Sequence, residues 1–173
     1  MKANFLMALI LCCICSHGQK TKNKLQFHSI SFSPISFYGG DHTGGLSLYF
    51  DLGFNSNKNI IKASILSGSE FDILGDRNDE FTEIGTLFGR EILKKNSFRI
   101  SGFAGLAYFK FKSLDKSTNS QNIYLKEETI SLPLQTNFRF QTGESFSLGL
   151  QLHCSINSAN TIFNTSILLQ WLL

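Results

Sequence analysis

The stretch SFSLGLQLHCSIN, from Ser145 to Asn157, constrains the fold most, because its residues alternate strictly in polarity. Phe, Leu, Cys and Ile occupy one parity, and Ser, Gly, Gln, His and Asn occupy the other. Side chains of a β-strand point alternately to its two faces, so this stretch predicts a strand with one apolar and one polar face. A soluble protein would bury the apolar face, whereas a membrane barrel would turn it toward lipid.

The same alternation recurs along the chain and predicts an all-β fold with eight strands. In the last segment, Leu168 and Leu172 are exceptions to the alternation, because they are apolar residues on the polar parity. In the first segment the apolar parity switches near Pro34, which predicts a bulge or an edge position. The predicted strands are 25–38, 44–55, 60–71, 81–92, 98–112, 129–140, 145–157 and 163–173.

The predicted connections alternate between longer and short, with an intermediate one at 157–160. The short ones are rich in Asn, Gly and Ser, as tight turns are. This alternation is typical of an up-and-down barrel with one rim in the periplasm and the other outside the cell. The predicted short turns are 55–58, 94–97 and 141–145, and the predicted longer connections are 39–45, 72–80 and 113–122.

Strand length and composition indicate which face meets lipid. The clean alternating runs have about 9 to 12 residues, the length of a membrane-spanning strand. Their polar parity is rich in Gly, Ser, Asn and Gln and poor in Lys and Glu, unlike a face in bulk water. We therefore predict an eight-stranded antiparallel up-and-down transmembrane β-barrel with its Phe/Leu face toward lipid. The alternative is a soluble, exported, lipocalin-like protein that binds an apolar ligand inside.

The N-terminus has the features of a secretory signal. Met1 and Lys2 give a positive start, and Phe5 to Cys15 is an apolar run too short to span a bilayer. Cleavage after Gly18 divides the chain into a signal peptide, 1–18, and an outer-membrane barrel domain, 19–173. A lipoprotein signal is the alternative, because three cysteines lie in this region.

Cysteine usage and charge exclude several classes of function. Only Cys154 of the four cysteines lies outside the signal, so neither a disulfide framework nor a Cys-x-x-Cys metal site is expected. Cys154 occupies the apolar parity of its strand and is expected to act as a small hydrophobic residue. The net charge is +3 with no basic run, so we expect no nucleic-acid partner.

Three segments, Glu80–Tyr108, Glu128–Phe140 and Ser147–Leu173, resemble the small outer-membrane β-barrel proteins common in Bacteroidetes. The similar features are a Gly-rich strand-turn-strand, a Leu-Pro-Leu segment, and a Gly-Leu strand followed by an Asn-containing loop. The resemblance implies the outer membrane of a Gram-negative bacterium, contact with its lipid, and insertion by the barrel-assembly machinery. Many members of this group have no assigned activity, so the resemblance implies none for this chain. The chain ends Trp171-Leu172-Leu173 rather than on an aromatic residue, which weakens the expected recognition by that machinery.

His153 and Ser155 are the weak candidates for catalysis, because residues two apart share one face of a strand. The HCSIN stretch resembles the His-x-Ser-Asn stretch of outer-membrane lipid A deacylases, which are also eight-stranded barrels. The chain departs from that pattern, because Ile156 replaces the Asn and no Asp or Glu follows Glu144. Their parity also points His153 and Ser155 into the lumen. We expect a hydrogen-bonded pair there, and a deacylase-like hydrolase is the alternative.

Five charged residues within the predicted strands are candidates for a site inside the barrel. An eight-stranded barrel has an interior just wide enough for side chains to fill, so these charges are expected to pair as packing rather than conduct ions or catalyse. They are Asp51, Lys62, Glu83, Arg99 and Arg139.

The remaining polar and aromatic features are expected to be structural. The acids Asp72, Asp76, Asp79 and Glu80 are close enough in sequence to bind a divalent cation, but their spacing is not that of an EF-hand. We expect them to be solvated loop charges, with no metal and no cofactor. Gly39-Gly40 and Gly44-Gly45 are predicted turn glycines. The candidate interface aromatics are Tyr38, Tyr108, Tyr124 and Trp171, each of which could equally be strand packing.

These expectations together predict a non-enzymatic integral outer-membrane barrel. Its role would be structural, or would lie in contacts that its extracellular loops make with an unidentified partner.

Overall fold

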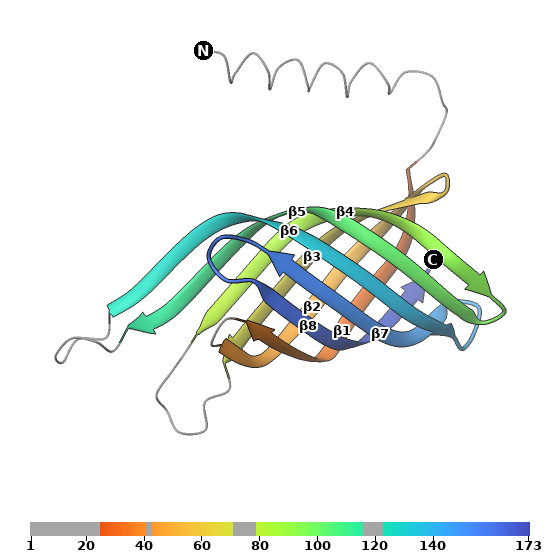
Figure 1. Ribbon diagram of the computed structural model, residues 1–173. Helices are drawn as coiled ribbons and strands as arrows, with labels where there is room; N and C mark the ends of the chain where they lie inside the picture. Colours follow the sequence, from red (N-terminus) through yellow and green to blue (C-terminus); the bar gives the residue numbers. More distant parts are fainter. Residues whose placement is uncertain (1–24, 41–42, 71–78, 116–122) are drawn as a thin grey trace, which may run out of the picture.

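The computed structural model describes residues 25–40, 43–70, 79–115 and 123–173, in which eight strands close into a barrel (Figure 1). Each strand pairs antiparallel with its neighbours in sequence, and β1 pairs with β8. The predicted all-β, eight-stranded barrel is thus confirmed. The strands are β1 (Gln26–Gly40), β2 (Thr43–Ser56), β3 (Asn59–Glu70), β4 (Glu80–Lys95), β5 (Phe98–Asp115), β6 (Ile123–Gln141), β7 (Phe146–Ile156) and β8 (Ile162–Leu172).

The two ends of the barrel carry different connections. The turn end carries the connections 57–58, 96–97 and 142–145, the start of β1 and the end of β8, and the loop end carries the other connections. The predicted signal peptide, 1–18, lies outside the described residues. Within the described ranges, no helix is long and apolar enough to cross a membrane.

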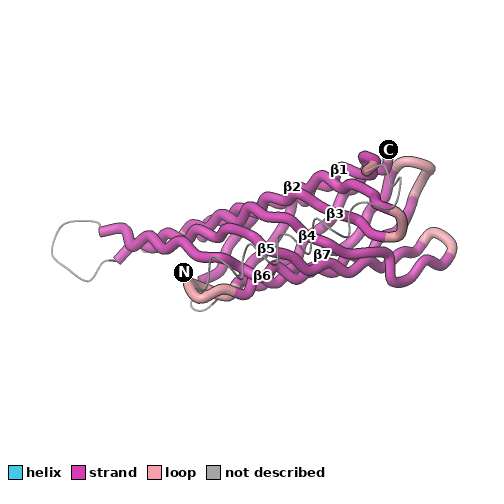
Figure 2. Tube along the Cα trace, turned by 90° about the horizontal axis from the view of Figure 1, so that it is seen from above, coloured by secondary structure: helices cyan, strands magenta, loops and turns pink. Residues whose placement is uncertain are grey.

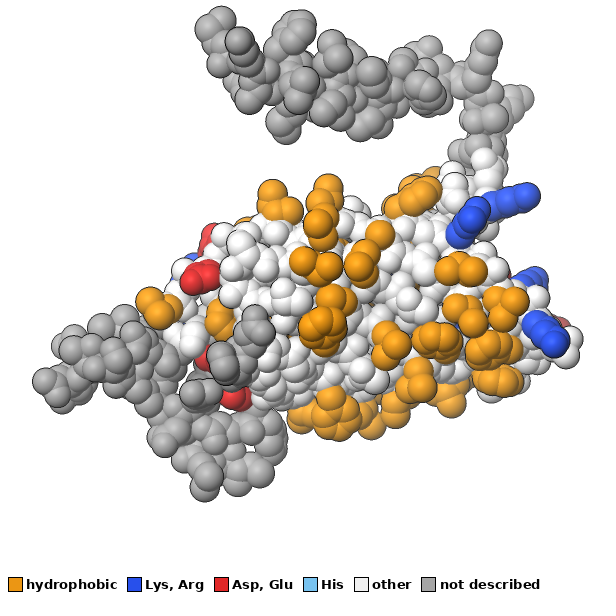
Figure 3. All heavy atoms as spheres, in the orientation of Figure 1, with side chains coloured by type: hydrophobic (Ala, Val, Ile, Leu, Met, Phe, Trp, Pro, Cys, Tyr) orange, Lys and Arg blue, Asp and Glu red, His pale blue; other side chains and the backbone are white. Residues whose placement is uncertain are grey.

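The strand of Ser145–Asn157 turns its apolar face outward. Leu150 is 53% exposed, whereas the adjacent Gln151 is completely buried in the barrel interior. The same holds around the wall, where exposed Leu, Ile and Phe side chains of every strand face outward. On the side drawn in Figure 3, hydrophobic side chains are spread along the wall. The soluble alternative required these side chains inside, so the structure contradicts it.

Strand β1 is irregular at Pro34, as the parity switch predicted. Its register shifts between Ser33 and Ser36 against β2, and between Phe32 and Ile35 against β8. On both sides of the shift, serines of β1 point inward and bond to β8 across the closing seam. These bonds are Ser36 Oγ to Asn164 Oδ1 at 2.8 Å, Ser166 Oγ to Ser33 Oγ at 3.3 Å, and Gln170 Nε2 to Ser31 Oγ at 3.0 Å.

The short turns match the prediction, but the first longer connection does not. Asn57 and Asn96 have positive φ angles of 61° and 52°, which Asn tolerates better than most residues. Gly39 and Gly40, predicted to be turn glycines, instead pair with Gly44 and Thr43, so only 41–42 connect β1 to β2. The predicted alternation of connection lengths is therefore wrong at this hairpin, because glycines extend a ladder without showing apolar alternation.

The β5–β6 hairpin continues past the barrel wall at the loop end (Figure 2). Strand β5 has 18 residues and β6 has 19, against 11 each in β7 and β8. The ladder between β6 and β7 starts only at Leu132, so the segment 123–131 of β6 pairs with β5 alone among the described residues. The predicted loop 113–122 is accordingly shortened to 116–122.

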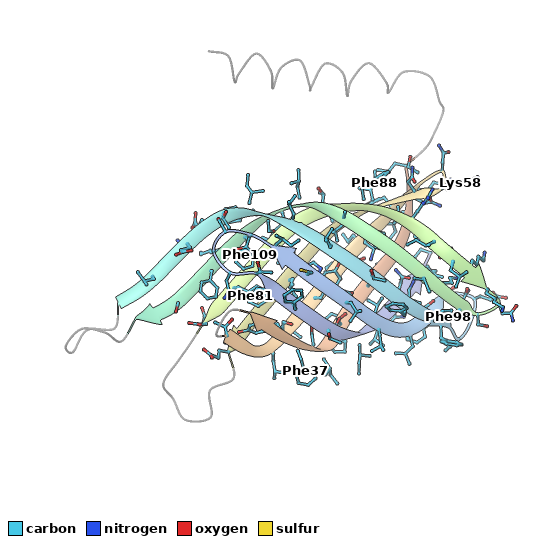
Figure 4. The ribbon with its side chains drawn as sticks, in the orientation of Figure 1. Phe37, Lys58, Phe81, Phe88, Phe98 and Phe109 are labelled. Atoms are coloured by element: carbon cyan, nitrogen blue, oxygen red, sulfur yellow. The ribbon has the colours of Figure 1, made fainter. Side chains whose placement is uncertain are left out.

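An aromatic cluster fills the interior at the loop end. Phe81 stacks on Phe109 with ring centroids 5.8 Å apart and meets the ring of Tyr38 edge-on at 4.8 Å (Figure 4). Tyr38 is therefore interior packing and not an interface aromatic, whereas Tyr108 and Trp171 face outward. The side chain of Tyr124 lies outside the described part. The cluster consists of Tyr38, Tyr49, Leu66, Phe81, Phe109 and Ile162.

Gly68 shows how tightly this cluster is packed. A Cβ atom at Gly68 would collide with the ring of Phe81 and would lie 3.0 Å from Cε1 of Tyr38. The absence of a side chain at this position thus lets both rings closely approach the inner face of β3. Leu168, an exception to the alternation of β8, also points into the interior and is completely buried.

Candidate functional site: the polar interior

The five charged residues predicted to pair inside the barrel all do so. Lys62 on β3 donates to Asp51 on the adjacent strand β2, with Nζ 2.6 Å from Oδ2. Both side chains are almost completely buried, and the ammonium also lies 4.5 Å from the centre of the Phe103 ring. A buried pair of this kind is closed packing, since each charge has its partner within hydrogen-bond distance.

A second network lies nearer the turn end and is centred on Glu91 of β4. Its Oε1 accepts hydrogen bonds from Arg99 Nη1 and Arg139 Nη2, each at 3.1 Å. Arg139 is buried and also donates to Ser101 Oγ at 2.6 Å and to the amide oxygen of Gln170. Sequence reasoning missed Glu91, although it shares the parity of Glu83 on the same strand. That shared parity was the available signal.

Glu83 supplies the carboxylate that His153 and Ser155 lacked in sequence. His153 Nε2 lies 3.0 Å from Glu83 Oε1, and Ser155 Oγ donates to Oε2 of the same carboxylate. Ser131 Oγ donates to that oxygen as well, at 2.8 Å. The expected hydrogen bond between His153 and Ser155 is therefore wrong, because both side chains contact the carboxylate of Glu83 instead. The acid comes from β4, which faces β7 across the lumen, rather than from the sequence after Glu144.

The order of contacts in this cluster differs from that of a catalytic triad. In a triad the hydroxyl bonds to the imidazole, which the acid orients from the far side. Here Ser155 donates to the carboxylate directly, and no hydrogen bond joins it to His153 within the described structure. His153 Nδ1 is buried without a partner among the described residues. His153, Ser155 and Glu83 are each no more than 3% exposed, so the cluster is closed to a lipid outside the wall.

Tyr49 connects this cluster to the amide groups of β6. Its hydroxyl donates to Gln135 Oε1 at 2.8 Å, and Gln135 Nε2 donates to Asn137 Oδ1 at 3.0 Å. Its ring lies 6.1 Å from that of His153. Polar residues of β2, β4, β6 and β7 thus form one contiguous layer across the barrel. This layer lies on the turn-end side of the aromatic cluster.

The loop acids are only partly within the described residues. Asp72 and Asp76 lie outside them, Asp79 is buried at the loop end, and Glu80 faces outward, 3.4 Å from Lys112 Nζ. Among the residues that the structure describes, no three His, Cys, Asp or Glu side chains converge on a possible metal position. The free thiol of Cys154 is on the outer, apolar face of β7.

Comparison with known proteins shows similarity of fold and little similarity of sequence. No family model and no curated protein matches the chain. Neisserial surface protein A has a TM-score of 0.64 at 9% identity, with 85% of this chain and 97% of that chain covered. Ail, the attachment invasion locus protein of Yersinia pestis, has a TM-score of 0.54 at 16% identity, with 86% and 99% covered.

A third solved structure is the N-terminal β-barrel domain of Pseudomonas aeruginosa OprF, with a TM-score of 0.56 at 10% identity. The alignment covers 87% of this chain and all of that domain. At these identities the likeness concerns the fold alone. The chain therefore has the eight-stranded β-barrel fold of outer-membrane proteins.

Proposed function

We propose that this chain is an integral outer-membrane barrel of a Gram-negative bacterium that acts without catalysis, through contacts made at its loop end. Its resemblance in sequence to small Bacteroidetes barrels supports that location. Its immediate partners are outer-membrane lipid and, during insertion, the barrel-assembly machinery. The extracellular partner is an unidentified molecule that meets the loop end.

The main support for an outer-membrane location is the apolar outer wall of the barrel. A water-soluble protein rarely exposes a contiguous apolar patch of more than a few hundred Å². Here large apolar side chains of all eight strands are exposed, among them Phe37, Phe88 and Ile130, which is 72% exposed. A closed barrel has no unpaired strand edges in its wall, so a bilayer can surround it without leaving backbone groups unsatisfied.

The interior supports a role without catalysis or conduction. The largest fully buried side chains include Arg139, Tyr49 and Lys62, which lie across the lumen and are hydrogen-bonded there. His153 and Ser155 are themselves no more than 3% exposed within this packing. The exposed surface beyond the wall is therefore where this protein meets other molecules.

The β5–β6 extension is the element best placed for such contact. At about 3.4 Å per residue, the 18 residues of β5 span roughly 60 Å, or roughly 45 Å along the axis of a tilted barrel. The apolar band of a membrane barrel is only about 25 Å tall. Beyond it the hairpin presents mixed charge, with Lys126 Nζ 3.2 Å from Glu128 Oε1.

Cysteine labelling in intact cells tests this topology. In a Cys154→Ser background, Glu127→Cys places a thiol on the extension, and Lys58→Cys places one at the turn end. A membrane-impermeant maleimide is expected to label Glu127→Cys in intact cells and Lys58→Cys only after permeabilisation. Labelling of both in intact cells, or recovery of the protein without detergent, would reject the proposal.

The wall itself is tested by Leu150→Arg. Leu150 faces outward near the middle of β7, where Arg in a membrane barrel costs about 2 to 4 kcal/mol. Folding into lipid vesicles, followed by urea titration, should show that loss of unfolding free energy. The matched control is Ser145→Arg in the exposed turn before β7, which is expected to fold like the wild type. Equal stability of the two variants would show that the wall does not face lipid.

A further inference from the structure

We infer that the turn end of the barrel holds a binding site for a phosphate-bearing anion. A hollow of about 570 Å³ lies there, beside the β2–β3 turn and the end of β4. Hollows of this size accommodate small organic ligands. Its polar lining includes His28, Asn55, Lys58, Arg90, Lys94 and Arg99.

Positive charge exceeds negative charge in this hollow. The lining has four basic side chains, Lys58, Arg90, Lys94 and Arg99, and its one carboxylate is that of Glu91. Glu91 is already shared by Arg99 and the deeper Arg139. Lys58, Arg90 and Lys94 form no ion pair with any residue of the described structure. On the face drawn in Figure 3, Lys and Arg side chains gather at this end, where Figure 4 labels Lys58.

Buried nitrogen atoms without partners provide a second, independent observation. Arg99 Nε and His28 Nε2 are both inaccessible, and neither has a hydrogen-bond partner among the described residues. Both residues line the hollow. A buried polar group without a partner lowers stability, so such groups are nearly always paired in native proteins. An anion with several oxygen atoms in the hollow would accept hydrogen bonds from Lys58 and Lys94. It would also accept them from Arg99 Nε and a protonated His28 Nε2 once those two side chains turn toward it.

The type and spacing of the cations favour phosphate over a single carboxylate. Guanidinium and ammonium groups of β4, β5 and the β2–β3 turn line the hollow, so a ligand with several acceptor oxygens can pair with more than one of them. Two sources of phosphate can reach the hollow. Arg90 is exposed on the outer side of β4, where a lipid headgroup would lie, and the hollow itself is open to soluble anions at the turn end.

Isothermal titration of the purified full barrel with sodium pyrophosphate tests the site. Octyl glucoside micelles are suitable because that detergent contains no phosphate. We expect saturable binding to the wild type, and binding about tenfold weaker or more for the double variant Lys58→Gln/Lys94→Gln. The control is Lys110→Gln/Lys126→Gln, which removes the same charge from the loop end and should change the dissociation constant less than about twofold.

The inference is overturned by a lack of saturable binding to the wild type, or by an equal loss in the loop-end control. Heat-modifiable gel mobility of each variant verifies that it is folded. Arg90→Gln, which also removes an exposed cation, is a second variant, and it is expected to weaken binding as well. Unchanged binding in both turn-end variants would likewise reject the site.

A competition arm distinguishes the two sources of phosphate. Short-chain phosphatidylglycerol is added to the micelles, and an equal mole fraction of oleate serves as an anionic control without phosphate. If a lipid headgroup fills the site, phosphatidylglycerol raises the apparent dissociation constant of pyrophosphate more than oleate does. If the site takes a soluble anion, the two additives have equal effects. Either result supports a phosphate site and names its ligand.

Discussion

The two ends of the barrel interior are closed by different chemistry. At the loop end, Tyr38, Phe81 and Phe109 pack ring against ring around Gly68. Toward the turn end, Glu91 holds two guanidiniums together, one of which is buried. An apolar layer needs only complementary shape, whereas a charged layer needs every member present, because the loss of one leaves another charge buried and unpaired.

This difference explains where each layer can lie in the molecule. The aromatic layer closes the interior next to the end that we propose faces outside the cell, so its closure does not depend on any ligand. The charged layer lies beside the cationic hollow, where a single carboxylate is surrounded by basic groups. Closure at the turn end is thus linked to electrostatics, and closure at the loop end is linked to packing.

The largest expected effect is on the aromatic layer. Phe81→Ala removes a ring that is 2% exposed and contacts two others, so a cavity forms and the unfolding free energy falls by about 3 to 5 kcal/mol. Urea titration of the protein in lipid vesicles measures this. Phe88→Ala, on the outer face of the same strand, leaves no cavity because lipid replaces the ring, and its loss should be smaller. Equal losses would show that the aromatic layer is loosely packed.

A somewhat smaller effect is expected in the charged layer. Glu91→Gln leaves the guanidiniums of Arg99 and Arg139 without their shared carboxylate. The expected loss is about 3 kcal/mol, the lower end for breaking a buried pair, since Glu91 itself is a quarter exposed. The same titration applied to Glu80→Gln, which breaks the exposed pair with Lys112, should show less than about 1 kcal/mol. Similar losses of unfolding free energy for both variants would show that the Glu91 network does not stabilise the turn end of the interior.

The smallest effect is expected between the two layers, at the Glu83 cluster. Ser155→Ala removes one of two hydroxyls bonded to Oε2 and should cost about 1 kcal/mol, because Ser131 remains. Neither this variant nor His153→Ala should change the acylation pattern of lipid A in cells, which mass spectrometry measures. The outcome that contradicts us is a shift by one acyl chain on gene deletion, restored by the wild type but not by Ser155→Ala.

The alternation of residues predicted which side chains form the wall, and it failed where that alternation is absent. Leu150 and Gln151 lie on opposite faces as expected, and the Pro34 bulge is where the parity switch placed it. Phe81 and Phe109 point inward within segments whose pattern is irregular, so the aromatic layer had no clear signal. Glycines 39 and 40 carry no polarity to alternate, which concealed the full length of β1.

The Glu83 cluster could not be predicted from the sequence, for a different reason. Strands β4 and β7 are not neighbours in the sheet, so their contact depends on the curvature and stagger of the closed barrel. Parity alone shows that Glu83 and His153 both point inward. It does not show at which height each lies, and this height decides whether the carboxylate meets the imidazole.

The seam between β1 and β8 has a consequence for how the chain folds. Seven of the eight strand pairings join consecutive strands, whereas β1 and β8 are joined by residues more than 120 positions apart, such as Ser36 and Asn164. Forming such a distant pairing is entropically expensive and slow compared with forming a hairpin. We therefore expect the open sheet to form first, with the inward serines of β1 still hydrated. Closing the seam is then the step that exchanges water for Asn164, Ser166 and Gln170, so insertion and dehydration of the lumen end together.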